Sequence, residues 1–216
     1  MQTPDLERDK RYEAWFSTPF GGRADRVEKL ILRGLLDDFT ESHSLLDVGC
    51  GIGHFADWFT SLGLSVAGLD RGPSMVTFAR GQQPGLPLVL ADATHLPFGE
   101  TTFDVVALVT VLEFLDSPEA ALREAGRVAR HGLILGVLNR LSPIALWRRL
   151  RRAAPYRRAR FFSPGQLERL LRTSLGYRPI AIRWRTGLYP THWLDHWTAL
   201  PFGAFIGLSV QFEEGG

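Results

Sequence analysis

Three glycines at alternate positions follow a short apolar segment that carries an acidic residue. Residues 45–48 read as a buried strand containing Asp47, and Gly49, Gly51 and Gly53 come directly after it. Glycines at this spacing let the main chain turn tightly, and they let a ligand approach backbone N–H groups with no side chain in between. The spacing predicts a ligand-binding turn between a strand and a helix. A turn that binds nothing is the alternative, since tight turns need glycine in any case.

A second acidic residue, Asp70, closes the next apolar segment, residues 65–69. A carboxylate at this place can accept hydrogen bonds from both ribose hydroxyls of a nucleoside cofactor. Asp47, just ahead of the glycines, would repel a pyrophosphate and suits a cationic amine instead. The two carboxylates together favour a nucleoside that carries an amine over a dinucleotide.

Short apolar runs alternate with helical patterns along most of the chain. The predicted strands are residues 45–48, 65–69, 87–91, 103–110, 132–138, 180–186 and 204–212. The predicted helices are residues 24–39, 55–62, 73–80, 117–128 and 163–172. This alternation predicts an α/β fold: a Rossmann-like open sheet, mostly parallel with an antiparallel edge strand, and helices on both faces.

Length and composition fit one globular domain. The chain has 216 residues, of which 45% are apolar and 22% are charged. We expect a single domain over residues 1–216. Within it we expect an N-terminal helical cap or lid at 1–40, a cofactor-binding core at 44–138, and substrate-side insertions with the last strands at 139–216.

The chain shows no sign of an oxidising compartment or of a membrane span. Its single cysteine, Cys50, excludes an intramolecular disulfide and a thiolate-rich metal site. No apolar run reaches the about 18 residues that a spanning helix needs, and the charged N-terminus does not fit a signal peptide. These features predict a cytoplasmic protein. The net charge of +2 gives no global case for nucleic-acid binding.

Four segments in order, LLDVGCGIGHF, VAGLD, ADATHLPF and FDVVALVTVLEFL, resemble the class I S-adenosylmethionine-dependent methyltransferases. The sequence is most similar to the ubiquinone and menaquinone C-methyltransferase-like (methyltransferase type 11) group. The match runs from about residue 45 to residue 138, and beyond Asn139 the likeness is only architectural. The resemblance implies S-adenosyl-L-methionine as the cofactor and requires no metal.

The resemblance also implies a set of cofactor-binding residues along these segments. They are Asp47, Gly49, Cys50, Gly51 and Gly53 around the methionine portion, Asp70 at the ribose with Arg71 beside it, Met75, Asp92 and Ala93 at the adenine, and Thr110 with Val111 beneath the cofactor. Two of them keep a structural alternative, Asp92 as a turn former and Met75 as a core residue. Cys50 is assigned no chemistry, because a small packed residue fits its place between two glycines.

Methyl transfer from a sulfonium is an in-line displacement, so the protein mainly aligns the acceptor with the methyl group. Glu113 and Tyr12 are the candidate catalytic residues. Glu113 follows the fourth strand and could act as a base, and Tyr12 could place an aromatic face near the sulfonium. Glu113 could equally begin a helix. Residues 12–20 could equally be a strap packed on the sheet rather than a lid.

Acceptor binding could involve residues on both sides of the core. The candidates are Trp15, Phe16, Arg160 and His192. His192 and His196 have the spacing of a helical pair, but a metal would want a third ligand, so no metal site is predicted. Residues 148–160 are rich in arginine and could meet RNA, anionic lipid headgroups or an acidic substrate, or form a solvated helix face.

The sequence therefore predicts an S-adenosylmethionine-dependent methyltransferase that acts on a small-molecule acceptor. One alternative is an RNA methyltransferase that uses the basic segment from Arg148 to Arg160. The other is a cofactor-binding protein without catalysis. Peripheral membrane contact stays open, and so does the choice between monomer and homodimer.

Overall fold

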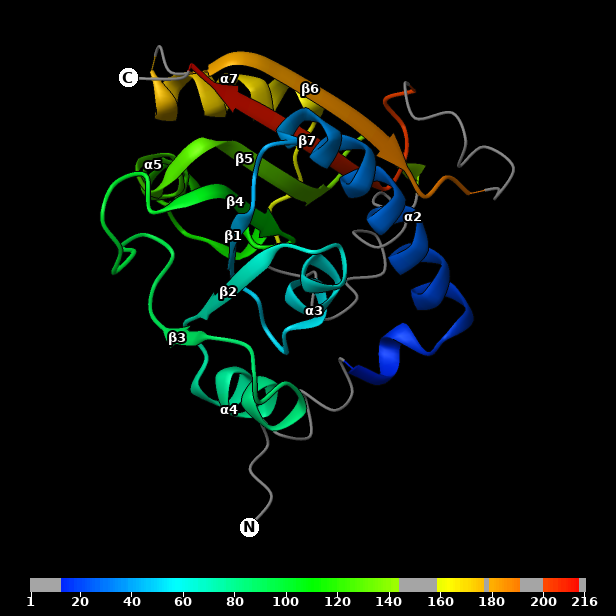
Figure 1. Cartoon of the computed structure of the whole chain (residues 1–216). Coiled ribbons are helices and arrows are strands. Elements are labelled where there is room, and N and C mark those ends of the chain that lie inside the picture. Colours follow the sequence, from blue (N-terminus) through cyan, green and yellow to red (C-terminus); the bar gives the residue numbers. More distant parts are fainter. Residues whose placement is uncertain (1–12, 144–158, 177–178, 191–199, 214–216) are drawn as a thin grey trace.

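The computed structural model describes residues 13–143, 159–176, 179–190 and 200–213 (Figure 1). Tyr12, His192 and residues 148–158 of the basic segment lie outside these ranges. The predictions about them therefore stay predictions.

In the described part of the chain, seven strands form one sheet in the order β3-β2-β1-β4-β5-β7-β6. The strands are β1 (Ser44–Val48), β2 (Ser65–Asp70), β3 (Leu88–Leu90), β4 (Phe103–Val109), β5 (Ala129–Leu138), β6 (Pro179–Gly187) and β7 (Phe205–Phe212). The first five pair in parallel, whereas β7 pairs antiparallel with both β5 and β6. The predicted fold class, a mostly parallel open sheet with an antiparallel edge, is confirmed.

Helices cover both faces of this sheet (Figure 1). They are α2 (Pro19–Leu36), α3 (His54–Ser61), α4 (Pro73–Gln82), α5 (Pro118–Val128) and α7 (Pro164–Leu175), with the short 3-10 turns η1 (Asp37–Phe39) and η2 (Leu112–Phe114). Leu122 of α5 and Leu171 of α7 belong to the core on one face, and Ile31 of α2 and Phe59 of α3 to the core on the other. Within the described ranges, no helix is both long and apolar enough to cross a membrane.

The N-terminal helix begins earlier than its apolar periodicity predicts. Helix α2 starts at Pro19 rather than at residue 24, because Thr18 caps it. The Thr18 hydroxyl oxygen accepts a hydrogen bond from the Gly21 N–H at 3.0 Å, and proline at the first helical position loses no hydrogen bond. The periodicity detects the buried face of the helix, and the capped first turn lies outside that pattern.

The strand order reverses between β1 and β4. In open parallel sheets, ligands bind in the crevice outside the carboxyl ends of the strands at such a point. The segments that begin at Gly49, after β1, and at Thr110, after β4, therefore border the place where a ligand is expected.

Asn139, directly after β5, binds the segment that precedes β7 at the same edge of the sheet. Its side chain is fully buried, and Nδ2 donates to the carbonyl oxygens of Pro201 and Gly203, both at 2.7 Å. Oδ1 accepts from the Leu141 N–H at 3.0 Å, and the Asn139 N–H donates to the Ala204 carbonyl at 2.9 Å. These bonds hold the connection before β7 against the end of β5.

Candidate active site

A cleft lies at the carboxyl edge of the sheet, between the segments that follow β1, β2, β3 and β4. Its lining combines a glycine, apolar side chains, one threonine and two charged residues: Gly49, Leu69, Asp70, Arg71, Ala91, Ala93, Thr110, Val111, Phe114 and Leu115. Gly49, Asp70, Arg71, Ala93 and Thr110, all predicted from the sequence as cofactor residues, therefore meet at one place.

The glycine-rich turn depends on the absence of side chains. Gly49, Gly51 and Gly53 have φ values of +74°, +55° and +85°, in the left-handed region that side-chain-bearing residues rarely adopt. A Cβ atom on Gly49 would lie 2.4 Å from Cγ2 of Val111, a distance at which the two atoms would overlap. A Cβ atom on Gly51 would meet nothing within 4 Å. The turn thus packs tightly against the segment after β4 at its start and borders open space at its middle.

Asp70 connects this turn to the end of β2. Its Oδ2 accepts from the Gly51 N–H at 2.9 Å, and its Oδ1 accepts from the Gly72 N–H at 2.7 Å. A carboxylate offers about four acceptor sites, so both oxygens can also receive hydrogen bonds from a ligand. The single carboxylate therefore shapes the cleft and presents acceptors to it.

Asp47 lies beneath the turn and is only 2% exposed. Burial and the nearby negative charge of Asp70 raise the pKa of its carboxyl group to about 7, against a smaller lowering by the Ala56 N–H. Its Oδ2 is buried and has no hydrogen-bond partner among the described residues. Buried polar atoms are nearly always paired, so this oxygen is an exception. Asp47 itself does not line the cleft, although Gly49, two residues later, does.

Thr110 begins the segment after β4 with a strained backbone. Its φ is +54°, although it is not glycine, and its N–H donates to the Gly136 carbonyl at 2.6 Å. Such residues cost about 1 to 3 kcal/mol and cluster at ligand-binding sites. The turn at Thr110 brings Val111 over Gly49.

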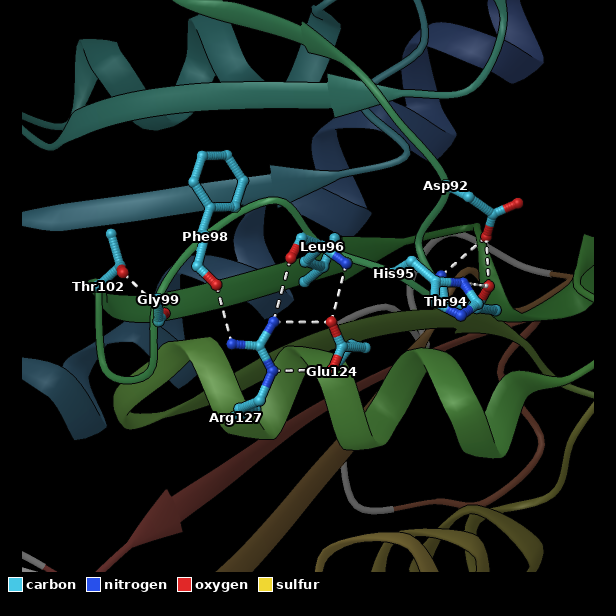
Figure 2. A network of polar contacts seen from close by, with 9 residues as sticks. All are labelled: Asp92, Thr94, His95, Leu96, Phe98, Gly99, Thr102, Glu124 and Arg127. Atoms are coloured by element: carbon cyan, nitrogen blue, oxygen red, sulfur yellow. Dashed lines mark hydrogen bonds and ion pairs between the residues drawn. The ribbon is translucent and has the colours of Figure 1, made fainter.

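The loop after β3 supplies Ala91 and Ala93 to the cleft. Asp92 between them is exposed, and its Oδ1 accepts from the N–H and the hydroxyl of Thr94 at 2.8 and 2.7 Å. These bonds lower the pKa of Asp92. Asp92 thus forms the turn that its structural alternative predicted, while its second oxygen points away from Thr94 (Figure 2).

Arg127 and Glu124 of α5 fasten the next part of this loop, as Figure 2 shows. The Arg127 guanidinium donates to the Phe98 carbonyl at 2.8 Å and to the Leu96 carbonyl at 3.1 Å, and it pairs with Glu124 at 2.7 Å. Glu124 in turn accepts from the Leu96 N–H at 2.8 Å. The helix therefore holds the loop in place by its main-chain groups.

Glu113 lies in η2 and is only 1% exposed. Its Oε1 accepts from the Leu138 N–H, and its Oε2 is buried with no partner in the described part of the chain. Burial raises the pKa of this carboxyl group to about 7. Its backbone carbonyl accepts from the Arg160 N–H at 2.8 Å. Glu113 is not among the residues that line the cleft, although its neighbours Phe114 and Leu115 are.

Residues 46–136 match the methyltransferase domain family. They include the glycine-rich turn, Asp70, the loop that Arg127 binds, and η2. These residues form a methyltransferase domain.

Similarity to other proteins extends beyond residues 46–136. The chain is 36% identical to an uncharacterised protein of Mycobacterium tuberculosis over 177 residues, which are 80% of this chain and 59% of that protein. It is 33% identical to a demethylmenaquinone methyltransferase of Renibacterium salmoninarum over 88 residues, 41% of this chain and 37% of that protein. The chain thus spans 59% of the length of its mycobacterial relative.

Solved structures agree with the methyltransferase domain. An S-adenosylmethionine-dependent methyltransferase of Thermotoga maritima has a TM-score of 0.78 and 25% identity, covering 96% of this chain and 97% of that one. A magnesium protoporphyrin IX methyltransferase of Synechocystis, solved with bound SAH, has a TM-score of 0.64 at 17% identity, covering 97% and 89%. The predicted family is confirmed over residues 46–136, and the fold of the Thermotoga protein agrees with it.

Met75 and Cys50 are not among the residues that line the cleft. Met75 packs beside Gly72, where a Cβ atom would lie 3.3 Å from the Met75 Cγ. Cys50 is 8% exposed, and its Sγ fills the space over Gly68 of β2. Burial raises the pKa of the Cys50 thiol, which fits a packing residue better than a nucleophile.

The aromatic residues ahead of α2 dock on the helix that follows the glycine-rich turn. The Phe16 ring stacks on His54 with 3.8 Å between centroids, and Trp15 meets Phe16 edge to face at 5.1 Å. His54 also bonds Asp25 of α2, with 2.6 Å between Nε2 and Oδ1. Trp15 and Phe16 are thus brought to the outside of the turn and do not line the cleft.

Arg160 is exposed and touches the site through its backbone bond to Glu113. Among the described residues, no group of three His, Cys, Asp or Glu side chains is placed to hold a metal ion. Leu69, Phe114 and Leu115 line the cleft although the sequence did not single them out. Phe114 is 41% exposed, and its place in the segment after the apolar strand was the one available signal.

Removing the Arg127 guanidinium is expected to loosen the loop of Figure 2. Arg127→Ala should lower the free energy of unfolding by about 2 kcal/mol, because two carbonyl groups and Glu124 lose a charged partner. S-adenosylhomocysteine should then bind several-fold more weakly, since the loop carries Ala93. Urea unfolding and titration calorimetry measure the two effects. Arg130→Ala removes a 55% exposed side chain that pairs with Asp104 at the other edge of the sheet, so it should leave the affinity unchanged.

The buried carboxyl of Glu113 should make stability depend on pH. Its pKa is raised from 4.5 to about 7 in the folded protein. The contribution of Glu113 to the free energy of unfolding is therefore fully present below about pH 4.5 and is lost as the pH rises through 7. Glu113→Gln should remove this pH dependence, which amounts to about 3 kcal/mol of unfolding free energy at most. Urea unfolding at pH 5 and pH 8 measures the difference. The exposed control Glu119→Gln should behave as the wild type, and an unchanged pH dependence in Glu113→Gln would contradict the prediction.

Proposed function

We propose that this protein is an S-adenosylmethionine-dependent methyltransferase that methylates a small-molecule acceptor. The observation that carries the proposal is the bond between the Gly51 N–H and Asp70 Oδ2, which joins the glycine-rich turn to the carboxylate beside one cleft. A ligand with ribose hydroxyls next to a charged amino-acid portion matches these two features.

The residues of the cleft suit this cofactor. The orphaned Oδ2 of Asp47 and the open space at Gly51 fit a ligand that brings a positive charge close to the main chain. Asp70 would accept from the ribose hydroxyls, and the Ala93 N–H with the second oxygen of Asp92 would receive the adenine. When bound, the cofactor supplies a sulfonium methyl group that a nucleophile can displace.

The protein's own contribution is placement and exclusion of water. Thr110 and Val111 would form the floor, since their position is set by the strained turn and by packing on Gly49. Phe114 and Leu115 give the rest of the wall an apolar surface. Holding the acceptor in line with the methyl group can supply roughly 7 to 11 kcal/mol of the barrier.

Glu113 is proposed as a positioning residue of this wall. Its carboxyl holds the Leu138 N–H and its carbonyl holds Arg160, so it sets where Phe114 stands. A base must come within hydrogen-bond reach of the acceptor. The Glu113 carboxyl does not line the cleft, so direct proton transfer would require η2 to move.

A methyl-transfer screen tests the proposed function. Wild-type protein and Asp70→Ala are incubated with methyl-tritiated S-adenosylmethionine and separate pools of small metabolites and RNA. We expect label in a metabolite fraction with the wild type and none with Asp70→Ala. Label in RNA would favour the alternative based on the basic segment. Binding of S-adenosylhomocysteine without any transfer would favour a non-catalytic protein.

A further inference from the structure

We propose that the methyl acceptor is an apolar carboxylic acid, whose apolar body lies on four exposed side chains beside the cleft and whose carboxylate lies near two arginines. The four side chains are called the apolar rim: Phe114, Leu141, Leu200 and Phe202. The two arginines are Arg140 and Arg160. The inference rests on the proposed function and adds to it the chemical class of the acceptor.

The apolar rim holds most of the large apolar side chains that are exposed in the described part of the chain. Seven such side chains are exposed, and the four of the rim are 40% to 53% exposed. The other three are Phe20 and Leu30 of α2 and Leu90 of β3. Single exposed apolar residues are ordinary, whereas a group of them beside a cleft marks a place for an apolar ligand.

Main-chain hydrogen bonds connect the rim to the wall of the cleft. Phe114 itself lines the cleft from η2. The Arg160 N–H donates to the carbonyl of Glu113 in η2 at 2.8 Å, and the Arg140 N–H donates to the Phe162 carbonyl at 2.8 Å. The segment around residues 160–162 therefore lies between η2 and the chain that leaves β5. The rim continues the apolar wall of the cleft toward β5 and β7.

Buried polar groups hold the part of the rim that precedes β7. Because β7 runs antiparallel to β5, its start lies beside the end of β5 (Figure 1). The buried amide of Asn139 binds the carbonyl groups on both sides of Phe202 at 2.7 Å. The hydroxyl of Tyr189, a residue only 2% exposed, donates to the Leu200 carbonyl at 2.7 Å. The main chain is thus fixed where it presents two apolar side chains to solvent, and a preorganised surface binds a ligand at a lower entropy cost.

Two positive charges accompany the rim. Arg140 stands directly before one rim residue in the chain, and Arg160 is bound through its N–H to Glu113, directly before another. Both side chains are exposed, and neither guanidinium has a hydrogen-bond or ion-pair partner among the described residues. The exposed acid nearest to the rim in the chain is Asp116. An apolar surface with two exposed guanidinium groups and one carboxylate fits an apolar molecule that carries a negative charge.

A carboxylate is an anion that can accept a methyl group directly. It is ionised at neutral pH, so its oxygen already has the electron pair that attacks the methyl carbon, and no base is needed. A new O–C bond forms while the C–S bond of the sulfonium breaks, and the electron pair of that bond goes to sulfur. The products are a methyl ester and S-adenosylhomocysteine, and no proton is taken up or released. This step agrees with a cleft that the Glu113 carboxyl does not line.

The chemical form of the transferred methyl group tests the proposal. The wild type is incubated with methyl-tritiated S-adenosylmethionine and the small-metabolite pool, and the products are extracted with an organic solvent. Alkali converts a methyl ester into volatile methanol, whereas methyl ethers and N- or C-methyl products are stable. We expect the label to enter the organic phase and alkali to release it as tritiated methanol. Label that resists alkali, or that stays in water, would overturn this inference and leave the proposed function intact.

Binding of octanoate tests the surface independently of turnover. Octanol has the same chain without the charge, and butyrate has the same charge with a shorter chain. Each is titrated by calorimetry into the protein saturated with S-adenosylhomocysteine. We expect octanoate to bind about tenfold more tightly than either, or better. An affinity equal to that of butyrate would overturn the role of the apolar rim, and one equal to that of octanol would overturn the role of the arginines.

Two variants separate charge from apolar contact. Arg160→Gln should weaken octanoate about tenfold and octanol by about twofold at most, and Arg160→Lys should restore most of the loss. Phe202→Ser should weaken octanoate and octanol alike, by about fivefold. The matched controls are Leu30→Ser, at a 59% exposed leucine of α2, and Arg123→Gln, at an exposed arginine of α5. Both controls should bind octanoate as the wild type does.

Other outcomes decide against the inference. Equal losses of octanoate and octanol in Arg160→Gln would make this arginine a support of the fold. Binding to phosphatidylglycerol vesicles that Phe202→Ser abolishes, without binding of octanoate, would assign the rim to a membrane surface. If the wild type neither binds S-adenosylhomocysteine nor transfers label, the proposed function fails as well. Binding of S-adenosylhomocysteine without binding of octanoate rejects this inference alone.

Discussion

Asp70→Ala is expected to lower the affinity for S-adenosylhomocysteine by about 100-fold or more, or about 3 kcal/mol. The loss has two parts. The ribose hydroxyls would lose charge-assisted acceptors, and the Gly51 and Gly72 N–H groups would lose the oxygens that they bind at 2.9 and 2.7 Å. The turn would then no longer be held to the end of β2. Titration calorimetry at one pH measures the change.

Asp92→Ala is the matched control for this experiment. Asp92 is also a carboxylate beside the cleft, but it is exposed and its Oδ1 is occupied by Thr94. The affinity should fall about tenfold or less, the weight of a single exposed contact. Similar losses in both variants would indicate that any nearby negative charge matters and that Asp70 has no special place.

Gly49→Ala is expected to be the most damaging small substitution in the turn. The new Cβ would sit 2.4 Å from Cγ2 of Val111, and alanine at a φ of +74° costs about 1 to 2 kcal/mol by itself. Displacing Val111 adds overpacking of about 1 to 3 kcal/mol. We expect a loss of about 2 to 5 kcal/mol in unfolding free energy and no measurable cofactor binding. Urea unfolding and calorimetry measure both.

Two further variants separate strain from collision. Gly51→Ala has a similar left-handed φ of +55° but open space around its Cβ, so it should lose only about 1 kcal/mol. Adding Val111→Ala to Gly49→Ala should recover part of the stability, because the nearest atoms are removed. A double-mutant cycle with no coupling between positions 49 and 111 would contradict the packing explanation.

Local signals in the sequence were sufficient to predict most elements of residues 44–138. The apolar runs indicated the strands, and β4 is as buried as its unbroken pattern predicts. The glycines at 49, 51 and 53 marked a turn whose φ values are all positive. Boundaries were less accurate: α2 begins at Pro19 because its cap at Thr18 lies outside the apolar pattern.

Other features needed contacts between residues distant in the chain. Glu113 was a candidate base from its position after β4, and only the fold buries its carboxyl against Leu138. Phe16 was a candidate for the acceptor pocket, which stays a prediction, and only the fold shows that its ring stacks on His54. The hydrogen bonds of Asn139 have no local signal in the sequence, because its partners Pro201 and Gly203 lie more than 60 positions later.

The sequence alone determined the strand and helix pattern, the glycine turn and the acidic residue that closes β2, because turns and periodicity depend on neighbours within a few residues. Only the tertiary structure decided that Gly51 and Asp70 would meet and that Asp47 would be buried near the Asp70 carboxylate. The physical reason is that strand order and helix packing bring together side chains that no local pattern connects, and burial then sets which of them can hold a charge.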